Sequence, residues 1–441
     1  MLETLAEDIG TYDESTIVLN NTNRASAENL ANKLGAKLRI TSDGSFATLT
    51  LQNGTTIRDV YENKENRELL EKFSLDYYSK TSDIDESIES QDNSFVPTAP
   101  DYTISDTLYG NQSYMNYINV GDTWNTYRGS GVTVAVIDTG IDTDHPEFSG
   151  KISEYSYNAS EDKIVKDYTL EDGSYDWSLI EDEQGHGTSV AGVIAASMDG
   201  AGTVGIAPEV TLLIIKAECD ENGSFYRTSD LVFGLYYAIE RDADVVNMSF
   251  GTYSNPFEAA TKLAVDSDVI CVAAAGNDAT AALCYPAADE NVIGVGALED
   301  GGIELAEYFN YGENSDIVAP GTTYTTKIGG EYGISNGTSL ASPIIAGAMA
   351  LLKSQNKSIE FVDVQELLYA SCYDLGSKGD DWYYGYGALD ISALIMEERG
   401  TVTFDMLTDE LDDIEQVFIR NHTLQDIPEP TRTYAIFDGW Y

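Results

Sequence analysis

The chain has 441 residues, enough for two or three domains, and its 42% hydrophobic content supports a packed core. It is strongly acidic, because 75 Asp and Glu against 24 Lys and Arg give a formal net charge of -51. Such a surface repels phosphate backbones, so nucleic acid is excluded as a partner. Its carboxylates suit hard cations such as Ca²⁺, although acidity also serves solubility alone.

The sequence contains no membrane-spanning stretch and no zinc-binding pattern. No apolar run approaches the ~18 residues of a membrane-spanning helix. The first residues do not read as a signal peptide. The four cysteines show no CxxC or zinc-ligand spacing, and disulfides are neither implied nor excluded.

The first 80 residues have the pattern of a small α+β unit. Apolar alternation, leucines spaced by four and a glycine stop carry this prediction. The predicted elements are strands at 16–19, 46–51 and 73–78, a helix at 25–35 and a charged helix at 63–72. Residues 81–93 are rich in Ser, Asp and Glu, which is typical of a solvated linker.

From Val132 onward, nearly continuous apolar runs alternate with helical patterns. The apolar runs lie at 132–137, 210–215, 245–248 and 269–275, and the helical patterns include 187–197 and 231–241. Buried strands that alternate with helices predict an α/β fold with a mostly parallel sheet between helical layers. Functional sites in such sheets lie at the carboxyl ends of the strands.

Three polar residues stand at the ends of predicted elements. Asp138 follows a strand, His186 opens a helix, and Ser339 follows a glycine-bearing loop and precedes an apolar helix. Pro343 is expected in the first turn of that helix. Alone, each would more simply be structural, Ser339 as a helix cap. Together they match acyl transfer, in which a carboxylate orients a histidine that takes the serine proton.

Two other protease patterns are excluded. Residues 138–140, Asp-Thr-Gly, resemble an aspartic-protease loop, but that chemistry needs a second such carboxylate and the sequence has none. Residues 337–341 are not G-x-S-x-G, and α/β-hydrolases place serine first in the chain.

Segments 138–147, 185–188 and 337–343 resemble, in order, the three signatures of the subtilisin-like serine proteases, or subtilases. The resemblance covers roughly residues 114–395 and implies a serine endopeptidase. It assigns Asn277 to the oxyanion hole, beside the backbone N–H of Ser339.

The resemblance also implies a substrate-binding surface. It assigns substrate contacts to six residues: Ser249, Phe250, Gly251, Ala275, Gly276 and Cys284. The first three resemble a strand that pairs with an extended peptide. Cys284 stands where many relatives have glycine, so the first specificity pocket is expected to be shallow.

A structural calcium ion is implied at a loop of the same domain. Glu147 and Asp199 match positions that, in many relatives, hold Ca²⁺ together with backbone carbonyls of residues 197–203. The alternative is that both are solvated surface carboxylates.

By position and pattern, residues 1–80 resemble the subtilase propeptide, which assists folding, inhibits the site and is cut away autocatalytically. Maturation is expected within the linker 81–113, and the peptidase domain within 114–398. Residues 399–441 resemble the start of an internalin-type B-repeat, a β module of bacterial surface proteins, or alternatively form a tail strand packed on the protease. The chain is therefore expected to be a trimmed part of a longer secreted or cell-surface protein that has also lost its signal peptide.

The leading hypothesis is a secreted serine endopeptidase, made as an autoprocessed zymogen with its propeptide as intramolecular inhibitor. Its substrates are peptides or proteins. Broad scavenging and dedicated processing of one precursor or surface protein are not separable from the sequence. A surface binding protein with a silent protease-like domain is a further alternative, against which the intact site residues argue.

Overall fold

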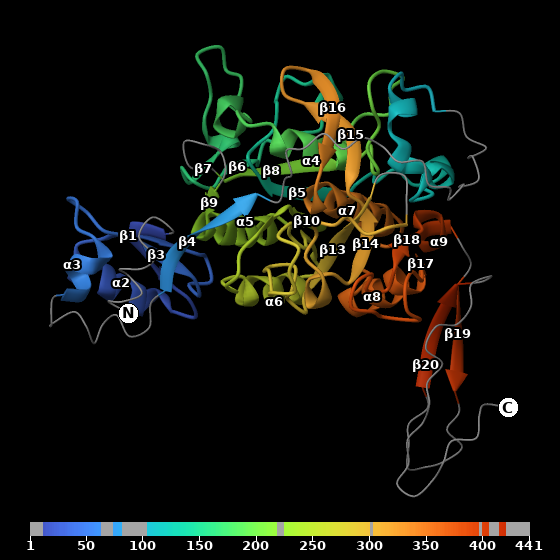
Figure 1. Ribbon diagram of the computed structural model, residues 1–441. Helices are drawn as coiled ribbons and strands as arrows, with labels where there is room; N and C mark the ends of the chain where they lie inside the picture. The colour runs from blue at the N-terminus through green and yellow to red at the C-terminus, as the bar shows by residue number, and fades with distance from the viewer. Residues whose placement is uncertain are drawn as a thin grey trace, which may run out of the picture.

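The computed structural model describes residues 12–62, 74–81, 104–217, 225–299, 303–396, 399–404 and 414–419. An N-terminal unit, a large α/β domain and a C-terminal β-hairpin follow one another along the chain (Figure 1). No helix in these ranges is long and apolar enough to cross a membrane.

The N-terminal unit is a four-stranded antiparallel sheet covered by helices. Its elements are β1 (Tyr12–Leu19), α2 (Arg24–Leu34), β2 (Lys37–Ile40), β3 (Ala47–Thr50), α3 (Ile57–Glu62) and β4 (Ser74–Thr81). The Asn23 side chain caps the start of α2, and Gly35 ends it in the left-handed conformation with φ 62°. The sequence pattern misses β2 and α3, and the helix that it predicts at 63–72 lies outside the described residues.

The large domain is built on a ten-stranded sheet in the order β17-β18-β14-β13-β12-β10-β5-β8-β6-β7. Its pairs are parallel except for β6–β7 and β17–β18. The strands are β5 (Thr133–Asp138), β6 (Tyr157–Asn158), β7 (Lys163–Ile164), β8 (Thr211–Lys216), β10 (Val245–Met248), β12 (Ile270–Ala274), β13 (Val292–Leu298), β14 (Ile317–Pro320), β17 (Cys372–Tyr373) and β18 (Ala388–Leu389). The α/β prediction with a mostly parallel sheet is confirmed.

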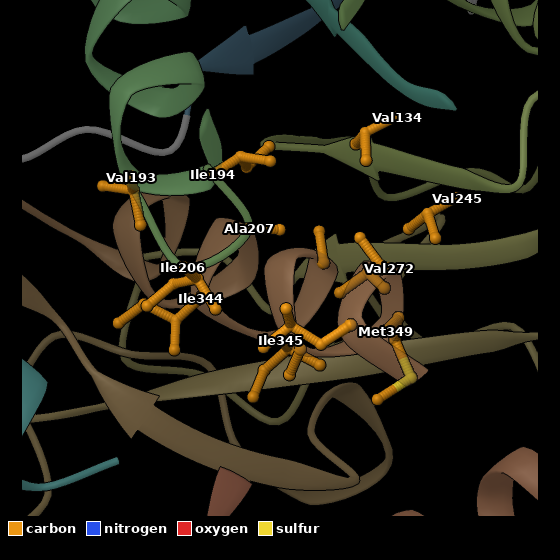
Figure 2. Close-up of a cluster of buried hydrophobic side chains, with 14 of the residues drawn as sticks. Val134, Val193, Ile194, Ile206, Ala207, Val245, Val272, Ile344, Ile345 and Met349 are labelled. Carbon is orange, nitrogen blue, oxygen red and sulfur yellow. The ribbon is translucent and has the colours of Figure 1, made fainter. Parts of the chain in front are cut away.

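Helices cover both faces of this sheet, as its continuous apolar strands require. One layer holds α4 (His186–Ala195), α7 (Thr338–Gln355), α8 (Phe361–Ala370) and α9 (Ile391–Met396), and the other α5 (Thr228–Glu240) and α6 (Glu258–Asp266). Alternate residues of β5 enter different cores: Val134 packs with the α4 and α7 layer, Ala135 with the α5 layer. Figure 2 shows Val134 and Val272 facing Ile345 of α7 in the first core.

The last strand of the N-terminal unit also belongs to the large domain. β4 lies between β9 (Phe225–Arg227) and β11 (Phe250–Gly251) and pairs with both in antiparallel fashion. Figure 1 shows β4 reaching from the N-terminal unit to the large domain. One sheet therefore runs from the N-terminal unit into the large domain.

Two further hairpins complete the described chain. β15 (Thr322–Lys327) and β16 (Glu331–Asn336) lead directly into α7. β19 (Arg399–Phe404) and β20 (Ile414–Ile419) form the C-terminal hairpin. Residues 420–441 lie outside the described part, and the B-repeat stays a prediction.

Candidate active site

A carboxylate and an imidazole meet at the carboxyl edge of the sheet. β5 ends at Asp138 and α4 begins at His186, and the Asp138 Oδ1 lies 2.6 Å from the His186 Nδ1. The Thr139 N–H and the Tyr226 hydroxyl donate to the same oxygen at 2.7 and 3.3 Å. Because a carboxylate oxygen surrounded by donors accepts, Nδ1 carries the proton and Nε2 is left as the basic nitrogen.

Two glycines allow this close approach. A Cβ added to Gly187 would lie 2.2 Å from the Gly140 carbonyl oxygen and 3.2 Å from the Asp138 Cβ. Gly140 has a φ of 118°, which disfavours any residue with a side chain. The glycines beside Asp138 and His186 thus bring the start of α4 against the end of β5.

Ser339 is the second residue of α7, which packs against α4. It is fully buried, and its Oγ makes no hydrogen bond within the described part of the chain. The prediction that Pro343 lies in the first turn is wrong, because α7 begins at Thr338 and Pro343 lies inside the helix. Lacking an N–H, Pro343 leaves the Ser339 carbonyl without its helical donor, and the Ser249 Oγ donates to it instead at 2.9 Å.

Asn277 follows β12, two strands from β5 in the sheet, and is held in one orientation. Its Oδ1 accepts from the Thr338 N–H at 3.1 Å and from the Thr338 Oγ1 at 2.9 Å. Since a backbone N–H only donates, the amide oxygen must face Thr338, and the Nδ2 donors point elsewhere. The Ser339 N–H belongs to the first turn of α7, where N–H groups lack helical acceptors.

β4 occupies the strand position that the sequence assigns to a bound peptide. Its register pairs Gly251 with Lys80 and Phe250 with Thr81 on one side, and Tyr226 with Ser79 on the other. The sequence does not predict β9, which pairs with the other side of β4, because a three-residue strand has no periodicity.

Four residues predicted to bind substrate meet beside β11. A Cβ added to Gly251 would lie 2.3 Å from the Cys284 Sγ, and one added to Gly276 would lie 3.3 Å from it. Ala275 is fully buried in the core next to Gly276. Burial raises the pKa of the Cys284 thiol to about 12, so it stays protonated.

The two predicted calcium ligands lie at the loop 197–203. The Glu147 carboxylate accepts from the N–H groups of Ser197 and Thr203 and from the Tyr332 hydroxyl at 2.8–3.0 Å. The Asp199 Oδ1 accepts from the Ala201 N–H at 3.0 Å.

A third carboxylate, Asp106, also reaches this loop, and no motif in the sequence marks it. It accepts from the N–H groups of Asp199 and Gly200, and its Oδ2 is buried without a hydrogen bond in the described ranges. Burial raises the pKa of both Asp106 and Glu147, to about 7 for Glu147. The negative charge of Asp199 raises both pKa values further. Within the described ranges, however, no three such side chains form a metal-binding group.

The fold and this grouping at its carboxyl edge define the class: an α/β serine endopeptidase of the subtilisin type. The chain belongs to the subtilase family, whose sequence model matches residues 129–387.

Bacterial relatives agree with this placement. The chain is 39% identical over 256 residues to an intracellular serine protease of Paenibacillus polymyxa, covering 56% of this chain and 74% of that protein. It is 36% identical over 274 residues to a subtilisin of Bacillus pumilus, and the match covers 60% of this chain and 92% of that protein.

A solved structure shares the fold. Fervidolysin from Fervidobacterium pennivorans, described as a keratinolytic enzyme related to subtilisin, is similar with a TM-score of 0.73 at 24% identity. The match covers 90% of this chain and 64% of that one.

Proposed function

We propose that Ser339, His186 and Asp138 form the catalytic triad of a serine endopeptidase. The His186 Nε2 takes the proton of the Ser339 Oγ as that oxygen attacks the peptide carbonyl carbon. The C–N bond then breaks, His186 returns the proton to the leaving amine, and water hydrolyses the acyl-enzyme by the same route. Asp138 holds the imidazole in the required tautomer and stabilises its cation. The 2.6 Å contact between Asp138 and His186 supports this assignment most strongly.

The Asn277 Nδ2 and the Ser339 N–H act as the oxyanion hole. The support for Asn277 is its anchoring by Thr338, which fixes the amide before substrate binds. Preorganised donors of this kind stabilise charge at the moment it develops.

A fluorophosphonate probe tests the triad, because it labels only an activated serine. We expect labelling of Ser339 in the wild-type chain and none in Ser339→Ala or His186→Ala. Ser354→Ala, at the far end of the same helix, is the matched control and keeps the label. Failure of the wild-type chain to react would favour the silent surface-binding alternative.

We also propose that the chain is a zymogen whose N-terminal unit is its own inhibitor. β4 lies along β11, so a second peptide cannot pair there until β4 leaves. Extending the register beyond Thr81 leads to Ser249, whose Oγ bonds to the Ser339 carbonyl. The predicted linker is largely outside the described residues, but the register favours cleavage immediately after Ser82, with Ser82 as the acyl residue.

Mass spectrometry of the purified chain tests this proposal. The wild-type chain is expected to yield a new N-terminus at Asp83, whereas Ser339→Ala stays whole. If the wild-type chain also stays whole, the zymogen proposal is wrong. A cut elsewhere in residues 81–113 would contradict only the cleavage site predicted from the strand register.

The Cys284 sulfur, which lies against Gly251 and Gly276, favours small side chains at the acyl position, and Ser82 fits this preference. Such a restriction supports dedicated processing of a precursor or surface protein over broad scavenging. Profiling of cleavage sites in a peptide library decides between them, since a scavenger would cut after large apolar residues as well.

Calcium binding and secretion remain part of the proposal. The buried carboxylates around Asp199 support a cation at the loop 197–203, because a divalent charge would offset their mutual repulsion. Secretion or surface attachment rests on the resemblance of residues 399–441 to a B-repeat. Because one relative above is named intracellular, fractionation of the producing cell is the direct test.

A further inference from the structure

One arginine of the N-terminal unit is enclosed by groups of the peptidase domain. The Arg39 Nη1 lies 2.8 Å from the Asp230 Oδ1, and its Nη2 donates to the Tyr157 hydroxyl at 2.6 Å. The guanidinium carbon lies 3.9 Å from the centroid of the Phe233 ring. A carboxylate, a hydroxyl acceptor and an aromatic face therefore surround one planar cation.

The peptidase domain holds these groups in place by its own contacts. The Ser160 Oγ donates to the Asp230 Oδ2 at 3.0 Å, and the Asp230 side chain is only 3% exposed. The Tyr157 ring stacks on Tyr237 at 4.3 Å, and its hydroxyl donates to the Asp162 Oδ1 at 2.7 Å. Because the Tyr157 proton is directed at Asp162, its oxygen faces Arg39 as an acceptor.

This arrangement selects guanidinium over ammonium. A guanidinium is planar, donates in two directions within its plane and stacks its face on an aromatic ring. An ammonium is a point charge that cannot combine the three contacts at these positions. Burial raises the pKa of Asp230, and the charges of Arg39 and then Arg227 lower it again, so the carboxylate gains from a bound cation.

We propose that Asp230, Tyr157 and Phe233 form a guanidinium-binding site, distinct from the catalytic triad, that recognises an arginine side chain on a docked protein. Its ligand in this chain is Arg39 of the N-terminal unit. If that unit is the inhibitor proposed above, the site determines how firmly β4 is held over the active site. Once the unit has left, the site is open to an arginine of a protein substrate or another inhibitor.

The surroundings allow a small ligand to reach the site. A cavity of about 760 Å³ lies between the two domains and is lined by Arg39, Asp230 and Phe233 among others. A small guanidinium compound can therefore enter from this cavity when the arginine side chain is shortened.

Hydrogen exchange of the full chain carrying Ser339→Ala tests the site without relying on catalysis. We expect Arg39→Ala to speed exchange of the β4 amides at least about tenfold, as loss of one partner of a buried charge pair does. The β4 amides of Arg39→Lys should exchange nearly as fast as those of Arg39→Ala. Lys33→Ala, an exposed charge on the same unit, is the control and leaves exchange unchanged. Unchanged exchange rates of the amides in the central strands β5 and β12 would verify that each variant is folded.

Chemical rescue then identifies the ligand class. Ethylguanidinium at millimolar concentration should restore slow β4 exchange to Arg39→Ala, whereas ethylammonium should not. The rescue should vanish when Asp230→Asn is added. Equal exchange in Arg39→Ala and the parent chain, or equal rescue by both compounds, would overturn the site. Neither result bears on the triad, which the fluorophosphonate experiment tests separately.

Discussion

Thr338, the residue before the proposed nucleophile, connects three parts of the active site. Its N–H and Oγ1 both donate to the Asn277 Oδ1, and the same Oγ1 accepts from the Gly276 N–H at 3.1 Å. Thr338 is also the first residue of α7. The helix that carries Ser339 thus also orients the Asn277 amide, the proposed oxyanion-hole donor.

Replacing Asn277 with Ala should lower kcat by about 10²–10³ with little change in KM, the loss found on removing this kind of donor in subtilisin. Thr338→Val should give a smaller fall of the same kind, because it removes an anchor and keeps the donor. Steady-state kinetics on a peptide anilide measures both. A rise in KM at constant kcat would instead place Asn277 in ground-state binding.

Cys284 should set the size limit of the first specificity pocket. Cys284→Gly is expected to raise kcat/KM for substrates with a large acyl-position side chain roughly tenfold or more relative to a small one, because it removes the sulfur beside Gly251. Cys271→Ala, which alters a buried thiol in β12, should leave that ratio unchanged. A ratio that is the same in Cys284→Gly as in the wild type would show that the pocket is limited elsewhere.

At the scale of elements, a strand of one domain caps a helix of the other. Asp76 of β4 accepts from the Ser229 N–H at 2.9 Å and the Ser229 Oγ at 2.6 Å, at the first turn of α5. The helix has no side-chain cap from its own N-cap residue, Arg227. Asp76 therefore supplies an acceptor at the positive end of the helix dipole.

This cap should make docking of β4 depend on pH. Burial raises the pKa of Asp76 to about 7 from its usual value of 3.8, despite the two hydrogen bonds from Ser229 that lower it. The contribution of Asp76 to docking is therefore greatest below pH 3.8, and it is lost as the pH rises to about 7.

The measurement is the β4 exchange rate in the Ser339→Ala chain, divided by that in the same chain with Asp76→Asn. The ratio should rise between pH 5 and 7, by at most about tenfold per pH unit, and be flat above. Intrinsic exchange chemistry cancels in this ratio. A ratio independent of pH would show that Asp76 is already ionised when docked.

At the scale of the whole molecule, three separate parts of the chain converge on one loop. Asp106 precedes the large domain's sheet, Glu147 follows β5, and Asp199 lies in the loop itself. A cation there would tie the start of the domain to the layer that carries α4 and α7.

Removal of calcium should therefore lower the melting temperature. We expect EDTA to reduce Tm by roughly 5 °C or more in the wild-type chain, as loss of a ligand bound well above its Kd does. The double variant Glu147→Gln, Asp199→Asn should have a lower Tm than the wild-type chain before EDTA is added, and EDTA should not lower it further. A wild-type Tm that is insensitive to EDTA would leave the two residues as ordinary carboxylates.

The sequence predicts four adjacent strands of the ten-stranded sheet, β12, β10, β5 and β8, because they are buried and read as nearly unbroken apolar runs, as at 132–137 and 245–248. It also places Asp138 at the end of a strand and His186 at the start of a helix, whereas Asn277 is assigned by the family resemblance. The short strand β9 is not predicted, because three residues show no periodicity, and β11 is predicted only through the family resemblance. Contacts made by a single side chain, such as Tyr226 with Asp138, have no local signal either.

What the sequence determines by itself is therefore local chemistry: which polar residues end an element and which family the signatures match. The tertiary structure alone decides what lies in the substrate groove and what holds it there. β4 reaches β11, Arg39 reaches Asp230 and Asp76 reaches α5 across separations of more than 150 residues. Such pairings depend on how two packed units present their edges to one another, and no periodicity within either segment records that.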